Sequence, residues 1–148
     1  MAAVTMLDRL IEAGLKELLS TSVTGVTYHL SQETIEKDPP FLAIRATLGA
    51  ETPVRGSGVF EIPVEIIMAA HADDTTAQAF NVKSAQLLQA FYHDTTTVSR
   101  LNATTAIGAA RALRCDVTGS ESGVEGDERL LTRTLSLAVI AAPFSIGN

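Results

Sequence analysis

The chain has 148 residues, one cysteine and a formal net charge of −6. This length suits one domain with its own hydrophobic core. The negative charge excludes a general basic surface for nucleic acid, and a lone cysteine excludes an intramolecular disulfide. Hydrophobic residues make up 46% of the chain and charged residues 19%. Either part of the apolar surface is covered by other copies or by a partner, or the abundance of alanine raises the hydrophobic fraction.

The N-terminal residues do not read as a secretion signal, because Asp8, Arg9 and Glu12 interrupt any apolar core. No stretch approaches the ~20 apolar residues that span a bilayer. We therefore expect a soluble protein that is made in the cytoplasm.

Residues 4–20 are predicted to form the first helix, because apolar residues recur at helical spacing. Its apolar stripe consists of Leu7, Leu10, Ile11, Gly14, Leu15 and Leu18, and the charged residues expected to face water are Asp8, Arg9, Glu12, Lys16 and Glu17. A short strand is predicted over residues 23–30. After a polar segment, Pro39-Pro40 forces extension into a strand over residues 41–48. Residues 49–58 are expected to form a loop.

Residues 58–91 are the most informative part of the chain. Strict alternation over residues 58–70 predicts a long strand with one buried face and one face carrying Glu61 and Glu65. A helix is predicted over residues 75–92. The buried face of the strand is expected to hold Phe60, Ile62, Val64, Ile66 and Met68, and the helix stripe Ala77, Phe80, Ala85, Leu88 and Phe91.

The last third of the chain predicts a hairpin. Residues 98–110 have only a weak pattern, whereas residues 112–117 and 129–142 read as strands around a polar tip at residues 119–128. The fold expected is a single α+β domain over residues 1–148. Its mostly antiparallel sheet has long strands and a hairpin, flanked by an N-terminal helix and a central amphipathic helix. Extended loops or arms are expected near residues 45–58 and 118–129.

Few residues suggest chemistry. The histidines at positions 29, 71 and 93 match no metal-ligand spacing, and the last two fall at predicted helix ends, where Asp and His are common for capping. Cys115 lies inside a strand pattern, where a lone cysteine is usually a small packing residue. We therefore expect no catalytic residue, no cofactor and no metal. The acidic tip is either a solvated turn or an arm that becomes ordered against a partner.

Three segments carry a resemblance to a known family: residues 59–66 (VFEIPVEI), 85–91 (AQLLQAF) and 130–140 (LLTRTLSLAVI). With the order of helices and strands around them, they resemble the tail terminator or tail completion (neck) proteins of long-tailed bacteriophages. The resemblance covers most of the chain and is one of pattern.

The resemblance implies a structural virion protein without catalysis. It would form a homo-oligomeric ring, commonly a hexamer, that terminates the tail tube and joins it to the head connector. DNA would pass through the ring without specific binding. Assembly would use sheet edges and the two arms, and the interface residues expected there are Arg45, Arg55, Glu121, Glu125, Asp127 and Glu128. Its location would be the tail or neck of the virion.

Two other interpretations stay open at this point. The chain could be another virion protein, such as a tail tube subunit or a head-completion stopper. It could also be a small intracellular enzyme or ligand-binding domain, which would need a pocket with convergent polar groups.

Overall fold

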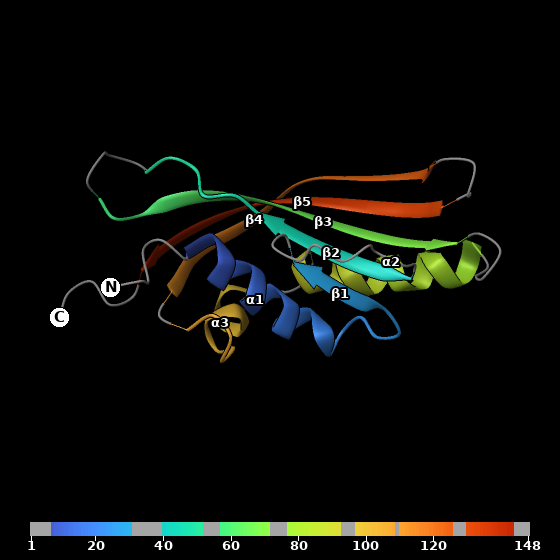
Figure 1. Cartoon of the computed structure of the whole chain (residues 1–148), viewed down its shortest axis with the longest axis horizontal. Coiled ribbons are helices and arrows are strands. Elements are labelled where there is room, and N and C mark those ends of the chain that lie inside the picture. The colour runs from blue at the N-terminus through green and yellow to red at the C-terminus, as the bar shows by residue number, and fades with distance from the viewer. Residues whose placement is uncertain are drawn as a thin grey trace.

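The structure is a computed structural model. It describes residues 7–30, 40–51, 57–71, 77–92, 97–108, 110–125 and 130–143. The elements in chain order are α1 (Leu7–Ser20), β1 (Thr27–Leu30), β2 (Phe41–Ala46), β3 (Phe60–His71), α2 (Ala77–Tyr92), α3 (Thr97–Asn102), β4 (Ala110–Glu125) and β5 (Leu130–Pro143). Figure 1 shows a long, twisted sheet with the three helices on one side of it.

The five strands form one sheet in the order β1-β2-β3-β5-β4. β1 runs parallel to β2, and every other neighbouring pair is antiparallel. β3 pairs with β5 along its whole length, from Phe60 opposite Ala141 to His71 opposite Leu130. The predicted α+β fold is therefore confirmed, with its mostly antiparallel sheet, its C-terminal hairpin, its N-terminal helix and its central helix.

The core lies between the sheet and the helices. In β3 the predicted alternation is confirmed, since Ile62, Val64, Ile66 and Met68 are buried while Glu61 and Glu65 are exposed. β5 contributes the matching residues Leu135, Leu137, Val139 and Ala141. Burial of each large aliphatic side chain contributes about 1.5–3 kcal/mol. The period of two in the sequence is thus a direct consequence of a sheet that packs on helices with one face only.

The sequence prediction was wrong about Glu12, which is only 1% exposed. Its Oε2 accepts a hydrogen bond from the Ala46 N–H at 2.7 Å, and its Oε1 lies 3.3 Å from Arg9 Nη1. Arg9 Nη2 also donates to the Ala46 carbonyl oxygen at 2.8 Å. The described pairing of β1 with β2 ends at Ile44, so these two side chains bind the backbone of β2 beyond the end of β1. They satisfy polar groups that a neighbouring strand would otherwise bind.

At the opposite edge of the sheet, the Asn102 side chain binds the backbone of an edge strand in a similar way. Its amide group donates to the Ala112 carbonyl oxygen at 2.9 Å and accepts from the Ala112 N–H at 2.7 Å. β4 is the edge strand here, and its register shifts beside Leu113 and again beside Thr118, as in β-bulges. Both devices discourage the pairing of another strand with this half of β4.

The extent of the polar tip was also predicted wrongly. β4 continues to Glu125, well past the predicted end at residue 117, and the residues from Gly119 to Glu125 pair regularly with β5. Small and polar residues can occupy this strand because it is an edge strand with one face open to solvent. Residues 126–129, between β4 and β5 in the sequence, lie outside the described residues.

The predicted stripe of α2 is partly wrong. Phe80, Leu87 and Ala90 are buried, but Ala85 is exposed and Ser84 is buried in its place. The Ser84 hydroxyl donates to the Phe80 carbonyl oxygen at 3.0 Å, so its polar group is satisfied inside the helix. Tertiary packing, and not the best apolar stripe, therefore set the rotation of this helix.

The weakly patterned segment at residues 98–110 contains α3 and the turns after it. Leu101 and Ile107 of this segment are buried in the common core. A Cβ atom at Gly14 of α1 would lie 2.9 Å from Leu101 Cδ1. The glycine thus permits close packing between α1 and α3, which a larger residue would prevent.

The segment predicted as a loop at residues 49–58 follows β3 in its first part. The Pro63 carbonyl oxygen accepts from the Thr47 N–H at 3.1 Å, and the Gly49 N–H donates to the Glu61 carbonyl oxygen at 2.9 Å. A proline is tolerated in this central strand because regular pairing with β2 ends at Val64, one residue away. The arm expected over residues 45–58 is therefore held on the sheet as far as Glu51, and residues 52–56 lie outside the described residues.

Tyr28 anchors the chain between α1 and β1. Its hydroxyl lies 3.0 Å from the Leu19 carbonyl oxygen and 2.5 Å from the Val23 carbonyl oxygen, and it donates its single proton between them. Burial raises the pKa of this phenol to about 12. Because the folded protein favours the neutral phenol, the stabilisation is complete below a pH of about 10 and is lost as the pH rises towards 12.

We expect the free energy of unfolding of the Tyr28→Phe variant at pH 8 to be about 1 kcal/mol lower than that of the wild type, because the variant loses the hydroxyl hydrogen bond. Above pH 10 the difference between the wild type and the variant should shrink. Urea unfolding of both proteins at pH 8 and pH 11 measures this. A difference that stays constant across the two pH values would show that the Tyr28 hydroxyl has no such role.

Candidate functional site

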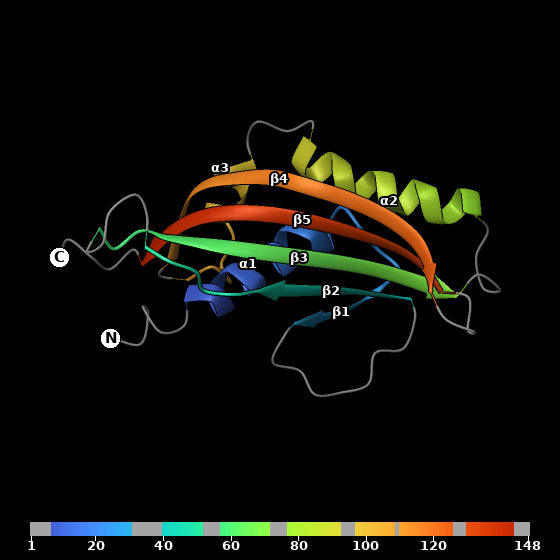
Figure 2. The same ribbon diagram turned by 90° about the horizontal axis from the view of Figure 1, so that it is seen from above.

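The residues that alternate with the core lie on the face of the sheet that none of the described helices covers. We call it the open face, and Figure 2 looks onto it. Arg45 of β2 lies directly across from Glu65 of β3, and Glu65 lies across from Ser136 of β5. Ser136 in turn pairs with Gly119 of β4. Because directly paired residues point to the same face, this row of residues crosses four strands.

Glu121 lies one row further along the open face. It pairs with Thr134 of β5, which pairs with Ile67 of β3. Arg45 and Glu121 come from segments far apart in the sequence, yet they lie on one face with Glu65 between them in strand order. The structure thus brings two of the predicted interface residues onto a common surface.

Two shallow hollows meet at the centre of this face. One has a volume of about 340 Å³ and the other about 310 Å³, and both are lined by Glu65 and Ser136. A Cβ atom added at Gly119 would meet no other atom within 4 Å, so the missing side chain helps to open the first hollow. The remaining lining residues of the first hollow are Ser120, Glu121 and Thr134, and those of the second are Arg45, Thr47, Pro63, Val64, Thr118 and Leu137. Together the hollows form a shallow, mostly polar groove.

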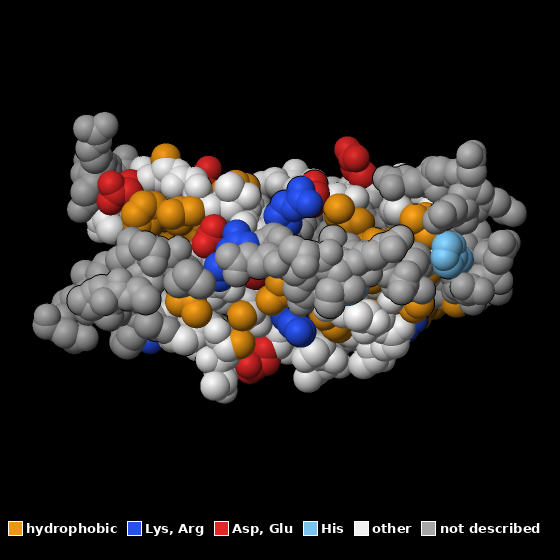
Figure 3. All heavy atoms as spheres, in the orientation of Figure 1, with side chains coloured by type: hydrophobic (Ala, Val, Ile, Leu, Met, Phe, Trp, Pro, Cys, Tyr) orange, Lys and Arg blue, Asp and Glu red, His pale blue; other side chains and the backbone are white. Residues whose placement is uncertain are grey.

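Charges of both signs are interspersed on the open face. Arg114 Nε lies 2.5 Å from Asp116 Oδ2 in an exposed ion pair, which contributes at most about 1 kcal/mol to stability. Arg45 and Glu65 are cross-strand neighbours of opposite charge. The side of the molecule seen in Figure 3 likewise shows acidic and basic side chains close together near its middle. Such a surface suits recognition by a protein with a matching pattern better than by a polyanion.

The structure does not describe the side chains of the other predicted interface residues. The backbone of Glu125 ends β4, but its side chain is outside what the structure describes. Arg55, Asp127 and Glu128 lie outside the described residues, so their predicted role stays a prediction.

The residues with potential for catalysis are dispersed. Burial, and to a smaller extent the charge of Asp116, raise the pKa of the Cys115 thiol to about 11, so that the thiol is protonated at neutral pH. This side chain packs against the core, as its strand pattern suggests. Among the residues that the structure describes, no three His, Cys, Asp or Glu side chains lie together in a group that could hold a metal ion.

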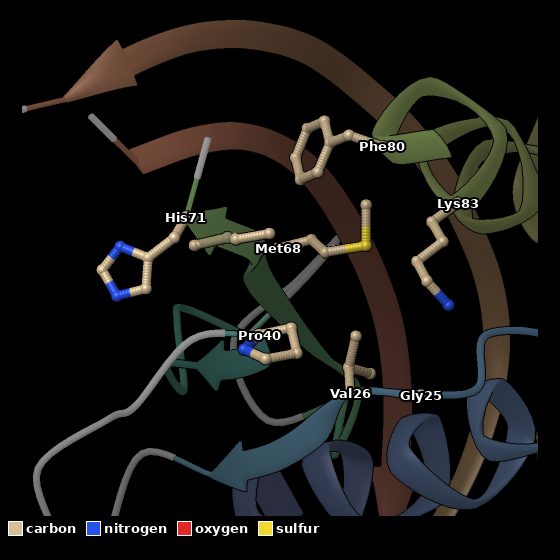
Figure 4. Close-up of a pocket in the computed structure, with 9 residues that line it drawn as sticks. Gly25, Val26, Pro40, Met68, His71, Phe80 and Lys83 are labelled. Atoms are coloured by element: carbon tan, nitrogen blue, oxygen red, sulfur yellow. The ribbon is translucent and has the colours of Figure 1, made fainter. Parts of the chain in front are cut away.

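A small cavity of about 190 Å³ lies between α2, the end of β3 and the residues that immediately precede β1 and β2. Figure 4 shows that its labelled lining is mainly apolar, with Val26, Met68 and Phe80 around it and the His71 ring directed away from Phe80 and Lys83. Lys83 Nζ donates to the Thr24 carbonyl oxygen at 2.5 Å. The cavity is smaller than the roughly 300–1,000 Å³ of typical ligand pockets.

Sequence reasoning missed the two residues at the centre of the groove as site residues. Glu65 was placed correctly on the solvent face, but nothing local linked it to Ser136. The alternation of Thr134 and Ser136 with Leu135 and Leu137 was a usable signal, since it marks the polar face of a half-buried strand. That alternation could have placed Ser136 on the open face, although not beside Glu65.

The comparisons with known proteins do not identify this chain. None of the models of known protein families matches it, and no curated protein matches it at a significant level. Among the described helices, none has the length and apolar character needed to cross a membrane.

Proposed function

We propose that this chain is a structural virion protein that forms a ring at the head–tail junction of a long-tailed bacteriophage. The ring terminates the tail tube and joins it to the head connector or stopper protein, and DNA passes through it without specific binding. The protein acts by assembly and carries out no catalysis. It is made in the host cytoplasm and resides in the tail or neck of the virion.

The observation that carries the proposal is the open face of the sheet. A sheet of five strands buries one face under three helices and leaves the other without a described helix, with a polar groove across four strands. Arg45 and Glu121, expected at the interface from the sequence, both lie there. A broad face with charges of both signs suits contact with another protein, and the resemblance supplies the kind of partner.

Two alternatives come from other classes of protein. A tail tube subunit or a stopper would use a similar surface but differ in how many copies assemble. A small ligand-binding domain or enzyme is favoured by one observation, the cavity beside α2, but that cavity is small and mainly apolar. This ligand-binding alternative does not use the groove on the open face.

Native mass spectrometry of the purified chain at near-physiological salt tests the proposal. We expect one discrete closed species, with six copies as the leading expectation. An open-ended series of oligomers would indicate a tube subunit instead. A monomer at every concentration would count against the ring and make screening of ligands for the cavity the next experiment.

A further inference from the structure

The cavity beside α2 has a buried floor and an exposed rim. On the floor, Met68 of β3 is 1% exposed and Phe80 of α2 is 6% exposed. At the rim, Gly25 and Pro40 are exposed and Val26 is partly exposed. A small molecule from solvent therefore has a path past the rim into a space that the hydrophobic core encloses.

The side chains around this space are mainly apolar. Figure 4 shows Met68, Phe80 and Val26 around it, with the His71 ring directed away from Phe80 and Lys83. Among the described residues that line the cavity, none is Asp or Glu. A buried water needs several polar partners, whereas cavities with apolar walls stay dry. The cavity therefore favours an apolar molecule over water.

Lys83 contributes its aliphatic part to the wall, and its charge is bound elsewhere. The ammonium group donates to the carbonyl oxygen of Thr24, which is not a lining residue, at 2.5 Å. A Cβ atom at Gly25 would lie 3.0 Å from Lys83 Nζ, so the glycine leaves room for the ammonium group at the rim. Long cationic side chains commonly cover apolar surface in this way while the charged end stays near water.

The same lining disfavours a charged ligand. An ion placed between Met68 and Phe80 would lose its hydration without an opposite charge among the described lining residues of the floor. An uncharged aromatic ring would instead contact the Met68 thioether and the Phe80 ring, and both contacts are favourable. The chemistry of the walls thus selects a neutral, apolar ligand.

The volume of the cavity sets the size of that ligand. An apolar cavity of about 150 Å³ with aliphatic and aromatic walls is large enough to bind benzene. The cavity here has a volume of about 190 Å³, which is enough for one aromatic ring and too little for a drug-sized molecule.

We propose that the cavity beside α2 is a binding site for a small uncharged apolar molecule of about the size of one aromatic ring. The bound molecule would join α2 to the end of β3 and to the residues that precede β1 and β2, and it would stabilise the folded chain by mass action. This inference goes beyond the proposed ring and does not depend on it.

Titration of the wild-type chain with benzene tests the site, with methyl NMR spectra and thermal unfolding as the measurements. We expect saturable shifts of the Met68 and Val26 methyl signals with a Kd of about 1 mM, together with a rise in Tm. Nuclear Overhauser effects between benzene and the Met68 methyl group should locate the ligand without any variant. Benzoate and benzylamine carry the same ring with a charge, and each should bind about tenfold more weakly or less.

Two variants fill the cavity from different sides. Ala70→Leu enlarges a partly buried lining residue of β3, and Val26→Phe enlarges a lining residue at the rim. Each should weaken benzene binding by about tenfold or more, because the added side chain occupies the space of the ligand. The matched control is Ala138→Leu, the same substitution in β5 opposite Pro63 on the open face, and it should bind benzene like the wild type. Circular dichroism and urea midpoints show which variants are folded.

Three results would overturn the site. The first is the absence of saturable shifts up to the solubility of benzene. The second is saturable binding without Overhauser effects to Met68, or binding that folded Ala70→Leu and Val26→Phe leave unchanged, since the ligand would then lie elsewhere. The third is tighter binding of benzoate than of benzene, which would show that Lys83 attracts an anion and that the ligand class is wrong. None of these results depends on the oligomeric state, so failure of the site and failure of the ring are separate outcomes.

Discussion

Replacement of Glu12 by alanine is expected to lower the free energy of unfolding by about 3 kcal/mol. The change removes the acceptor for the Ala46 N–H and leaves that group at the edge of β2 without its bond. It also removes the carboxylate that lies 3.3 Å from Arg9 Nη1. Arg9 keeps its second carboxylate neighbour, Asp8, at 3.0 Å, so part of the local electrostatic interaction survives.

Asp8 gives this network a signature in acid. Burial alone would raise the pKa of the Asp8 carboxyl, but the hydrogen bonds and the charge of Arg9 outweigh burial and lower it. Stability from this pair is therefore present above the ordinary pKa of Asp, about 3.9, and is lost as the pH falls through the lowered value. The Glu12 measurement is best made near pH 7, where this contribution is constant.

Chemical unfolding in urea measures the effect of Glu12 with two comparisons. Glu12→Gln keeps an oxygen that can accept from the Ala46 N–H, so it should lose only about 1–2 kcal/mol. Lys16→Ala changes a partly exposed residue of the same helix and should stay within about 0.5 kcal/mol of the wild type. Equal stability of Glu12→Ala and Lys16→Ala would mean that the buried carboxylate does not hold α1 on the sheet.

Replacement of Gly49 by alanine is expected to cost about 2–3 kcal/mol. A Cβ atom at this position would lie 2.5 Å from the Glu61 carbonyl oxygen, closer than any real contact of this kind. Since the obstacle is backbone of the central strand, it cannot move aside as a flexible side chain would. The segment after β2 must lift away from β3 and lose the bond from the Gly49 N–H to Glu61.

Gly119→Ala is the matched control for this experiment. It makes the same chemical change in a strand, but a Cβ atom at Gly119 would meet nothing within 4 Å. Its urea midpoint should therefore be close to that of the wild type, with an effect below about 0.5 kcal/mol. A Gly49→Ala variant as stable as Gly119→Ala would contradict the close approach of residues 47–51 to β3.

The sheet edges bear on how copies could assemble. Assembly through sheet edges was expected from the sequence, yet Arg9 and Glu12 bind the backbone of Ala46 at one edge and Asn102 binds that of Ala112 at the other. Strand addition is blocked at both positions. This is one reason to place the proposed contacts with other proteins on the open face of the sheet and not at its edges.

The sequence predicted several residues of the candidate surface one by one. The alternation in residues 58–70 placed Glu65 on a solvent face, and the arm prediction included Arg45 and Glu121. Their meeting on one face could not be predicted, because it depends on the registers of β2 with β3 and of β4 with β5. The bulges beside Leu113 and Thr118 change which β4 residues face outward, and no local sequence pattern predicted these bulges.

The sequence by itself determined the elements whose periodicity is strong: the long alternating β3, the returning β5 and the apolar side of α1. Those patterns are local, since a period of two or of 3.6 follows from the geometry of a single segment. Only the tertiary structure decided the strand order, the burial of Glu12 and the exchange of Ala85 for Ser84 on the buried side of α2. Each of these depends on contacts between residues distant in the chain, where packing and hydrogen bonding to a particular neighbour outweigh the preference of a single residue.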